Sequence, residues 1–304
     1  MARGRLRLAL LLALTFVVTY LFGIYSYSRE LWPIETLREL KRWADPPKPN
    51  VGQYDRQERL VAYPNKTEVA CPASGTATAV ILAIGQSNAA NDAAKKVTTR
   101  FPDRVFNYFD GRCYIAASPL LGTTSEGGEF LTLLADDLIA AGTYRRVIIV
   151  AAAHGGSSVL RWQRNGDLNK RLLSTLKTLP PGYKVTEVVW HQGERDFELM
   201  TPADLYAASF NSLLETLREN GVDAPVFNAV ATRCGAKANW TAGNPTANAQ
   251  RAVIDDRRIF LGADTDALLG DADRRADKCH LGESGQTKTA AAYAQAIKTF
   301  RRSP

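Results

Sequence analysis

The chain has 304 residues, of which 45% are hydrophobic and 23% are charged, and its formal net charge is +7. This composition is that of a globular protein with room for one large domain or two small ones. The basic residues are spread along the chain and form no stripe interleaved with aromatic residues, which argues against a nucleic-acid-binding protein.

The N-terminal segment has the pattern of a membrane anchor. Arg3, Arg5 and Arg7 precede a charge-free run over residues 8–28. As a helix, these roughly 21 residues span about 31 Å, close to the hydrocarbon thickness of a bilayer. We predict that residues 1–28 anchor the chain in a membrane through a transmembrane helix whose N-terminus stays in the cytoplasm. A cleaved signal peptide is the alternative. In both cases the rest of the chain is extracytoplasmic, and periplasmic in a Gram-negative bacterium.

Residues 29–61 are predicted to form a stalk. Leu31 to Trp43 is compatible with a short amphipathic helix, and the following Asp45-Pro-Pro-Lys-Pro run favours an extended chain. The remaining residues, 62–304, are predicted to form a single domain.

Within this domain, apolar strand-like runs alternate with amphipathic helices. The expected strands are 78–84, 104–109, 146–153, 185–190, 225–231 and 258–262, and the expected helices are 130–141, 168–179, 202–220 and 284–300. Strands separated by helices indicate an α/β fold. We expect a central parallel sheet of about five strands with helices on both of its faces.

Three polar motifs follow predicted strands directly. They are Gly85-Gln-Ser-Asn, His154-Gly-Gly-Ser and His191-Gln-Gly-Glu. Since ligands of such sheets bind beyond the carboxyl ends of the strands, we expect these distant motifs to meet at one edge.

The residues of these motifs fit acyl transfer through a serine ester. Ser87 is the candidate nucleophile, and it needs a base within hydrogen-bond reach. His280 can take its proton, and Asp277, three residues earlier, can orient the imidazole and stabilise its charged form. The alternatives are a helix-capping role for Ser87 and an ordinary loop cap at Asp277 and His280.

A second set of groups is suited to stabilising an oxyanion. The Ser87 N–H, the backbone of Gly155 and Gly156, and the Gln192 amide are the candidate donors. A tight turn after a strand is the alternative for the two glycines. Glu194 is expected to orient loops by hydrogen bonding rather than to act as a catalytic acid.

Four cysteines permit three disulfide pairings, of which we favour Cys71 with Cys113 and Cys234 with Cys279. Metal binding is the rival interpretation, but the cysteines lack the close spacing of a zinc site.

The ordered motifs resemble those of the SGNH hydrolase superfamily, and more narrowly its sialate O-acetylesterase and acetylxylan esterase branch. The resemblance rests on Gly85-Gln-Ser-Asn, Gly155-Gly156-Ser with Trp162, Trp190-His-Gln-Gly-Glu-Arg-Asp and Asp277-x-x-His280, and it covers residues 76–300. The resemblance implies a three-layer α/β/α sandwich of the flavodoxin-like kind. It also implies a serine esterase that removes acetyl groups from sugar hydroxyls without a metal or other cofactor.

Carried onto this sequence, the resemblance makes Ser87, Asp277 and His280 the triad, and Gly156 and Gln192 oxyanion donors with Ser87. Arg195 departs from the small residue usual at that position. Contacts to the substrate are expected from a further set of residues, namely Gly155, Arg161, Trp162, Glu194 and Arg233.

The sequence therefore predicts a carbohydrate O-acetylesterase acting on an acetylated polysaccharide or glycan. A polysaccharide O-acetyltransferase that uses the same triad is the first alternative, since fold and triad do not distinguish the acceptor. A non-catalytic glycan-binding module of the cell envelope is the second.

Overall fold

The computed structural model describes residues 2–29, 36, 40, 51–235 and 244–302, and the chain divides into two compact units, Met1–Asn50 and Val51–Pro304. In the first unit, helix α1 spans Ala2–Arg29. The helix predicted over 31–43 lies almost entirely outside the described residues. Over the ranges described, no helix has both the length and the apolar character needed to cross a membrane. The anchor over residues 1–28 thus stays a prediction.

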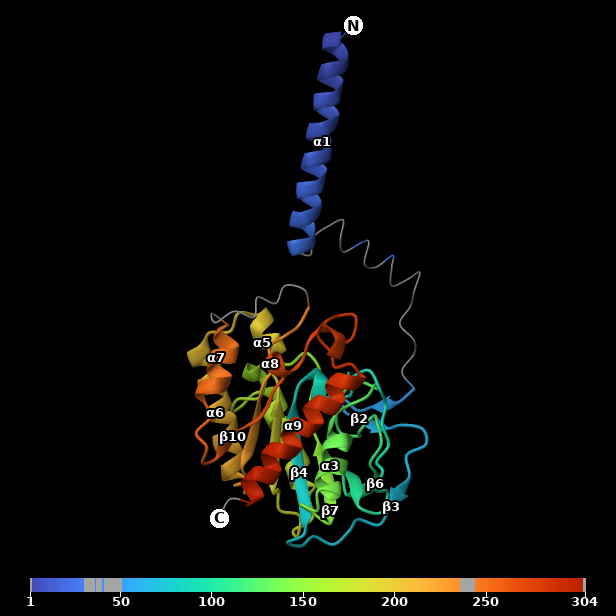
Figure 1. Cartoon of the computed structure of the whole chain (residues 1–304), viewed down its shortest axis with the longest axis vertical. Coiled ribbons are helices and arrows are strands. Elements are labelled where there is room, and N and C mark those ends of the chain that lie inside the picture. Colours follow the sequence, from blue (N-terminus) through green and yellow to red (C-terminus); the bar gives the residue numbers. More distant parts are fainter. Residues whose placement is uncertain (1, 30–35, 37–39, 41–50, 236–243, 303–304) are drawn as a thin grey trace. The chain divides into compact units, whose positions relative to one another are not determined.

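The second unit alternates strands and helices as expected (Figure 1). Its strands are β1 (Gln53–Tyr54), β2 (Leu60–Ala62), β3 (Glu68–Val69), β4 (Thr78–Gly85), β5 (Val105–Phe109), β6 (Arg112–Ile115), β7 (Arg146–Ala151), β8 (Glu187–His191), β9 (Val226–Val230) and β10 (Ile259–Asp264). Its α-helices are α3 (Leu131–Ala140), α4 (Asp167–Lys177), α5 (Glu194–Glu198), α6 (Ala203–Glu219), α7 (Pro245–Ala252), α8 (Thr265–Leu268) and α9 (Glu283–Arg302), and its short 3-10 helices are η1 (Ser87–Ala89), η2 (Val159–Arg161) and η3 (Asp271–Asp273).

The central sheet is larger than predicted and mixed rather than parallel. It has eight strands in the order β10-β9-β8-β4-β7-β5-β6-β3. The strands from β10 to β5 pair in parallel, whereas β6 pairs antiparallel with both β5 and β3. The expectation of a purely parallel sheet of about five strands was wrong at this edge.

The antiparallel edge arises from a tight hairpin between β5 and β6. Asp110 and Gly111 form its turn, with φ values of 43° and 87°. An Asp-Gly pair favours this turn because both central residues need a positive φ. The disulfide Cys71–Cys113 joins β6 to the segment after β3.

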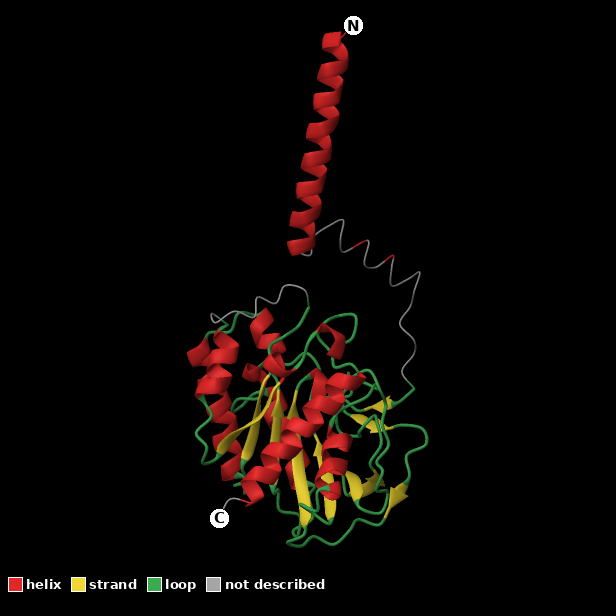
Figure 2. Ribbon diagram, in the orientation of Figure 1, coloured by secondary structure: helices red, strands yellow, loops and turns green. Residues whose placement is uncertain are grey.

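Helices cover both faces of the sheet, so the three-layer arrangement matches the prediction (Figure 2). Alternate residues of β4 face opposite layers, as a strand's pleat requires. Ile81 lies in a core with α3 and α9. Leu82 lies in the other core, with side chains of α4, α6 and α7.

The compact unit begins eleven residues before the predicted boundary at residue 62. Leu60 is completely buried, and its backbone exchanges hydrogen bonds with Thr123 and Gly122 at 2.7 and 3.0 Å. Strand β2 is therefore part of the folded domain rather than of a stalk.

Strand β4 lies at the point where the order of strands reverses. The chain adds β5 and β7 on one side of β4, and β8, β9 and β10 on the other. The loops after β4, β7 and β8 diverge around a crevice at the carboxyl edge, which is where such folds bind ligands.

Candidate active site

Ser87 stands at the start of η1, two residues after the end of β4. The turn requires glycine at position 85, because its φ is +131° and a Cβ there would meet the His191 carbonyl oxygen at 2.1 Å. The backbone of Gln86 donates to that same carbonyl at 2.9 Å. Ser87 is thereby fixed at the sheet edge, with 5% of its surface exposed.

Asp277 and His280 lie together on the loop between η3 and α9. One Asp277 oxygen accepts from the backbone N–H groups of Cys279 and His280, and the other lies 2.9 Å from His280 Nδ1. A proton on Nδ1 that is donated to Asp277 leaves Nε2 as the basic nitrogen. Although burial raises it, the hydrogen bonds from His280 and the loop backbone lower the pKa of Asp277 below its ordinary value. An ionised Asp277 is the form that stabilises a charged imidazole.

A cavity of about 360 Å³ brings the predicted motifs together. Ser87, His280, Gly155, Gly156 and Glu194 all line it. The loops after β4, β7 and β8 and the loop before α9 supply these residues, so four distant segments meet at the carboxyl edge as expected.

Two backbone amides at the cavity are suited to binding an oxyanion. The N–H groups of Ser87 and Gly156 have no hydrogen-bond partner within the described part of the chain. Gly156 has a φ of +63°, a left-handed conformation that favours glycine. Its neighbour Gly155 differs, because its N–H donates to Thr124 Oγ1 at 2.8 Å.

Gln192, the third predicted donor, is engaged elsewhere. Its side chain is completely buried, and its Nε2 donates to the Ser157 carbonyl at 3.0 Å and to an Asp196 oxygen. Its Oε1 accepts from the Tyr206 hydroxyl at 2.9 Å. An amide nitrogen has two hydrogens, so Gln192 could act as an oxyanion donor only by giving up one of these bonds.

Three of the predicted substrate contacts do not line this cavity. Arg161 pairs with Asp167 at 2.6 Å. Trp162 is completely buried and donates to Ser157 Oγ. Arg233 donates to the Leu269 carbonyl and to an Asp271 oxygen. Gly155 and Glu194, by contrast, do lie at the cavity.

The other two histidines are buried and structural. His154 contacts Arg171 through Nδ1 at 2.8 Å, and burial together with the Arg171 charge lowers its pKa to about 4. His191 packs 5.1 Å from the Phe130 ring, and burial lowers its pKa to about 3. Both are neutral near pH 7, and neither lines the cavity.

Sequence reasoning missed two residues of the cavity wall, Asp92 and Glu198. They line it together with Arg195 and the disulfide Cys234–Cys279. Burial raises the pKa of Asp92 above its ordinary value. In the sequence, the one indication that Asp92 lies near the active site is its position five residues after Ser87, in a turn-rich segment. Arg195 pairs with Glu198 at 3.1 Å, so its charge is neutralised locally.

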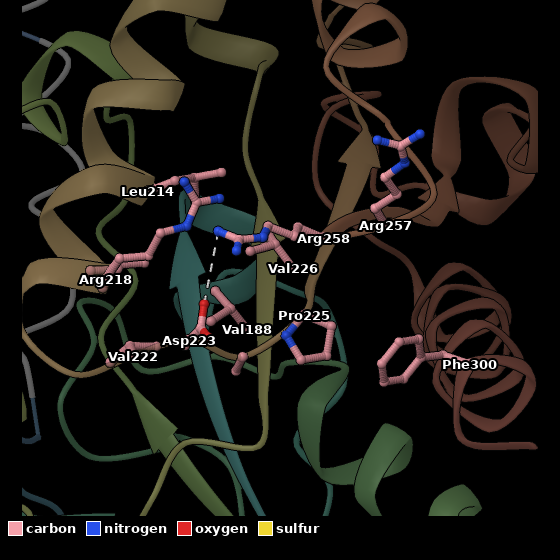
Figure 3. Close-up of a pocket in the computed structure, with 12 residues that line it drawn as sticks. Val188, Leu214, Arg218, Val222, Asp223, Pro225, Val226, Arg257, Arg258 and Phe300 are labelled. Atoms are coloured by element: carbon pink, nitrogen blue, oxygen red, sulfur yellow. Dashed lines mark ion pairs between the residues drawn. The ribbon is translucent and has the colours of Figure 1, made fainter. Parts of the chain in front are cut away.

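A second pocket, of about 180 Å³, lies at the opposite, amino end of the parallel strands (Figure 3). Val188, Val226 and Arg258 line it, and Arg258 lies 4.0 Å from Asp223. The described residues that line this pocket include no serine, histidine or cysteine. It therefore lacks the groups that acyl transfer needs.

Comparison with known proteins identifies the family. Residues 77–299 match the family model described as carbohydrate esterase, sialic acid-specific acetylesterase. A search of curated proteins finds no match.

Similar solved structures share the fold. A protein from Arabidopsis thaliana is 19% identical, with a TM-score of 0.58 over 75% of this chain and 99% of that one. NanS is 18% identical, with a TM-score of 0.53 over 75% of this chain and 99% of its own. A carbohydrate acetylesterase from Xanthomonas citri is 19% identical, with a TM-score of 0.51 over 72% of this chain and 56% of its own. With the family match over most of the chain, the protein belongs to the sialic acid-specific acetylesterase family of carbohydrate esterases and is a serine esterase, a carboxylic ester hydrolase.

Proposed function

We propose that the protein is a carbohydrate O-acetylesterase that releases acetate from acetylated sugar hydroxyls through an acyl-serine at Ser87. One observation carries the proposal. The imidazole of His280, held by Asp277 at 2.9 Å, lines the same cavity as the Ser87 hydroxyl. Among the described histidines, only His280 both contacts a carboxylate through one ring nitrogen and lines this cavity.

In the proposed first step, Ser87 Oγ attacks the acetyl carbonyl carbon while His280 Nε2 takes the hydroxyl proton. The negative charge that develops on the carbonyl oxygen is stabilised by the N–H groups of Ser87 and Gly156. The bond to the sugar oxygen then breaks, and His280 returns the proton to that oxygen. The products of this step are the free sugar hydroxyl and acetyl-Ser87.

In the second step, water attacks the acetyl-Ser87 carbonyl as His280 takes one of its protons. The tetrahedral intermediate collapses, the Ser87 oxygen leaves with the proton from His280, and acetate is released. Asp277 stays ionised throughout and stabilises the imidazolium in each step.

The experiment is p-nitrophenyl acetate hydrolysis by the Ser87→Ala variant. We expect loss of at least about 10³-fold in kcat with the folded state retained, as judged by circular dichroism. Turnover equal to that of the unaltered protein would defeat the assignment. Acetate release from a panel of acetylated glycans then identifies the natural class of substrate, and acetyl transfer to added polysaccharide would indicate the acetyltransferase alternative.

We further propose that this domain works outside the cytoplasm, tethered through residues 8–28. Arg3, Arg5 and Arg7 before a charge-free run support this orientation, as do two disulfides, which persist mainly in oxidising compartments. Protease treatment of intact spheroplasts tests it. Digestion of the domain without lysis is expected, and protection until lysis would refute it.

A further inference from the structure

We infer that Asn88 is a positioning residue that fixes the His280 loop against the Ser87 turn, and that Glu194 holds Asn88 in place. The inference rests on the proposed function, since it assigns Asn88 a role in the transfer of a proton between Ser87 and His280.

A single buried amide contacts the backbone on both sides of His280. Asn88 Oδ1 accepts from the Leu281 N–H at 2.8 Å, and its Nδ2 lies 3.4 Å from the Cys279 carbonyl. Asn88 is the residue directly after Ser87 and is completely buried. The side chain therefore connects the neighbour of the nucleophile with both neighbours of the base.

Leu281 and Glu194 together fix which way this amide faces. The Leu281 N–H can only donate, so the Asn88 oxygen must face it, and the Asn88 nitrogen then donates to Glu194 Oε1 at 2.8 Å. Glu194 begins α5 at the end of the β8 loop, and only 1% of its surface is exposed. Three segments, at 87–89, 194–198 and 277–281, are thus joined through one side chain.

The chemistry of this contact requires an amide at position 88. The side chain at position 88 has to accept from the Leu281 N–H and donate to Glu194. Asparagine is the only residue whose side chain is this short and carries both a carbonyl acceptor and an N–H donor on one planar group. An aspartate keeps the acceptor and loses the donor, while an alanine loses both.

The His280 loop has other supports, which allow it to fold without Asn88. Cys279 is bonded to Cys234, and Arg274 Nη1 donates to the Cys279 carbonyl at 3.0 Å. The Leu281 carbonyl accepts from the Ala94 N–H at 2.9 Å. The Asn88 hydrogen bonds differ from these supports, because they connect the loop to the residue next to Ser87. Removing them is expected to shift the base relative to the nucleophile rather than to unfold the loop.

The test is the steady-state kinetics of Asn88→Ala on p-nitrophenyl acetate, with Asn107→Ala as the matched control. Asn107 is also a completely buried asparagine whose amide pairs with backbone, accepting from the Leu121 N–H at 2.7 Å, but it does not contact the His280 loop. Displacing reacting groups by about 1 Å costs up to roughly 10²-fold in rate. We expect Asn88→Ala to lower kcat by about 10–100-fold with KM changed less than about twofold, and Asn88→Asp to lower it less.

A second readout observes the contact itself. The Leu281 N–H is expected to exchange with deuterium at least about tenfold faster in Asn88→Ala, because it loses its acceptor. The control is expected to keep kcat within about twofold, and its Leu281 exchange rate is expected to stay unchanged even if its melting temperature falls. The inference is overturned if Asn88→Ala keeps the unaltered kcat, or if the control loses as much kcat as Asn88→Ala.

A double variant tests the part assigned to Glu194. If Glu194→Ala acts through Asn88, the kcat of the double variant Asn88→Ala/Glu194→Ala will equal that of Asn88→Ala alone. If the fold-losses in kcat of the two single variants multiply in the double variant, Glu194 does not act through Asn88. The positioning role and the proposed function can fail separately. If Ser87→Ala is inactive while Asn88→Ala is fully active, the positioning role of Asn88 is refuted and the proposed function is not.

Discussion

Replacing Glu194 with glutamine is expected to change how the stability of the protein depends on pH. Burial raises the pKa of the Glu194 carboxyl from 4.5 to about 7, although the hydrogen bond from Asn88 and the charge of Arg274 act in the opposite direction. The folded protein therefore holds a proton on Glu194 at pH values where the unfolded chain has lost it. A carboxyl with a raised pKa stabilises the fold fully below pH 4.5, and this contribution is lost as the pH rises through 7.

The magnitude follows from the two pKa values. One pKa unit corresponds to about 1.4 kcal/mol, so the change from 4.5 to about 7 amounts to about 3 kcal/mol. Glutamine has a similar shape, keeps an acceptor for Asn88 and does not ionise. We expect Glu194→Gln to gain about 3 kcal/mol relative to the unaltered protein between pH 4.5 and pH 8.5, or roughly 6–12 °C in melting temperature.

The assay is urea unfolding of both proteins at pH 4.5, 6, 7 and 8.5. Groups common to both proteins, such as Asp92 and His191, largely cancel in the difference between the two unfolding free energies. A difference that stays constant over this pH range would show that Glu194 is already ionised at low pH in the folded state, and the reasoning about its burial would then be refuted.

Two further predictions concern the cavity. Gly156→Ala places a Cβ on a residue with a φ of +63°, so we expect a stability loss of about 1–2 kcal/mol. If the backbone relieves this strain by turning its N–H away from the cavity, kcat falls by about 10–100-fold with little change in KM, and an unchanged kcat would show that the left-handed conformation at this position does not limit catalysis. The double variant Cys234→Ser/Cys279→Ser removes a disulfide that joins residues 45 positions apart. This is expected to lower the free energy of unfolding by about 4 kcal/mol, and equal unfolding midpoints of the variant and the unaltered protein in urea would contradict it.

The sequence was sufficient to predict the elements that bury apolar residues in regular patterns. The run at 78–84 and the amphipathic helix expected over 202–220 correspond to β4 and α6 within one or two residues. The hairpin through Asp110 and Gly111 was missed although its turn residues signal it, because the short β6 lacks a long apolar run. The two-residue strand β3 offers no periodicity at all.

Positions of individual side chains at the site were harder to predict, because they depend on partners distant in the sequence. Arg161 was expected at the substrate, but a nearby Asp167 pairs with it on the surface. Gln192 lies in the expected loop, yet its amide turns inward to Ser157 and Asp196. A motif fixes where the backbone of such a residue lies, while the competition among hydrogen-bond partners fixes where its side chain points.

The most direct test of the proposed mechanism is labelling with a fluorophosphonate, followed by mass spectrometry of the digested protein. Phosphonylation requires a serine activated by a neighbouring base. We predict a single phosphonyl group on Ser87, with the labelling rate reduced at least about 100-fold in His280→Ala. A label on a different residue, or a labelling rate unaffected by the loss of the imidazole, would contradict the mechanism.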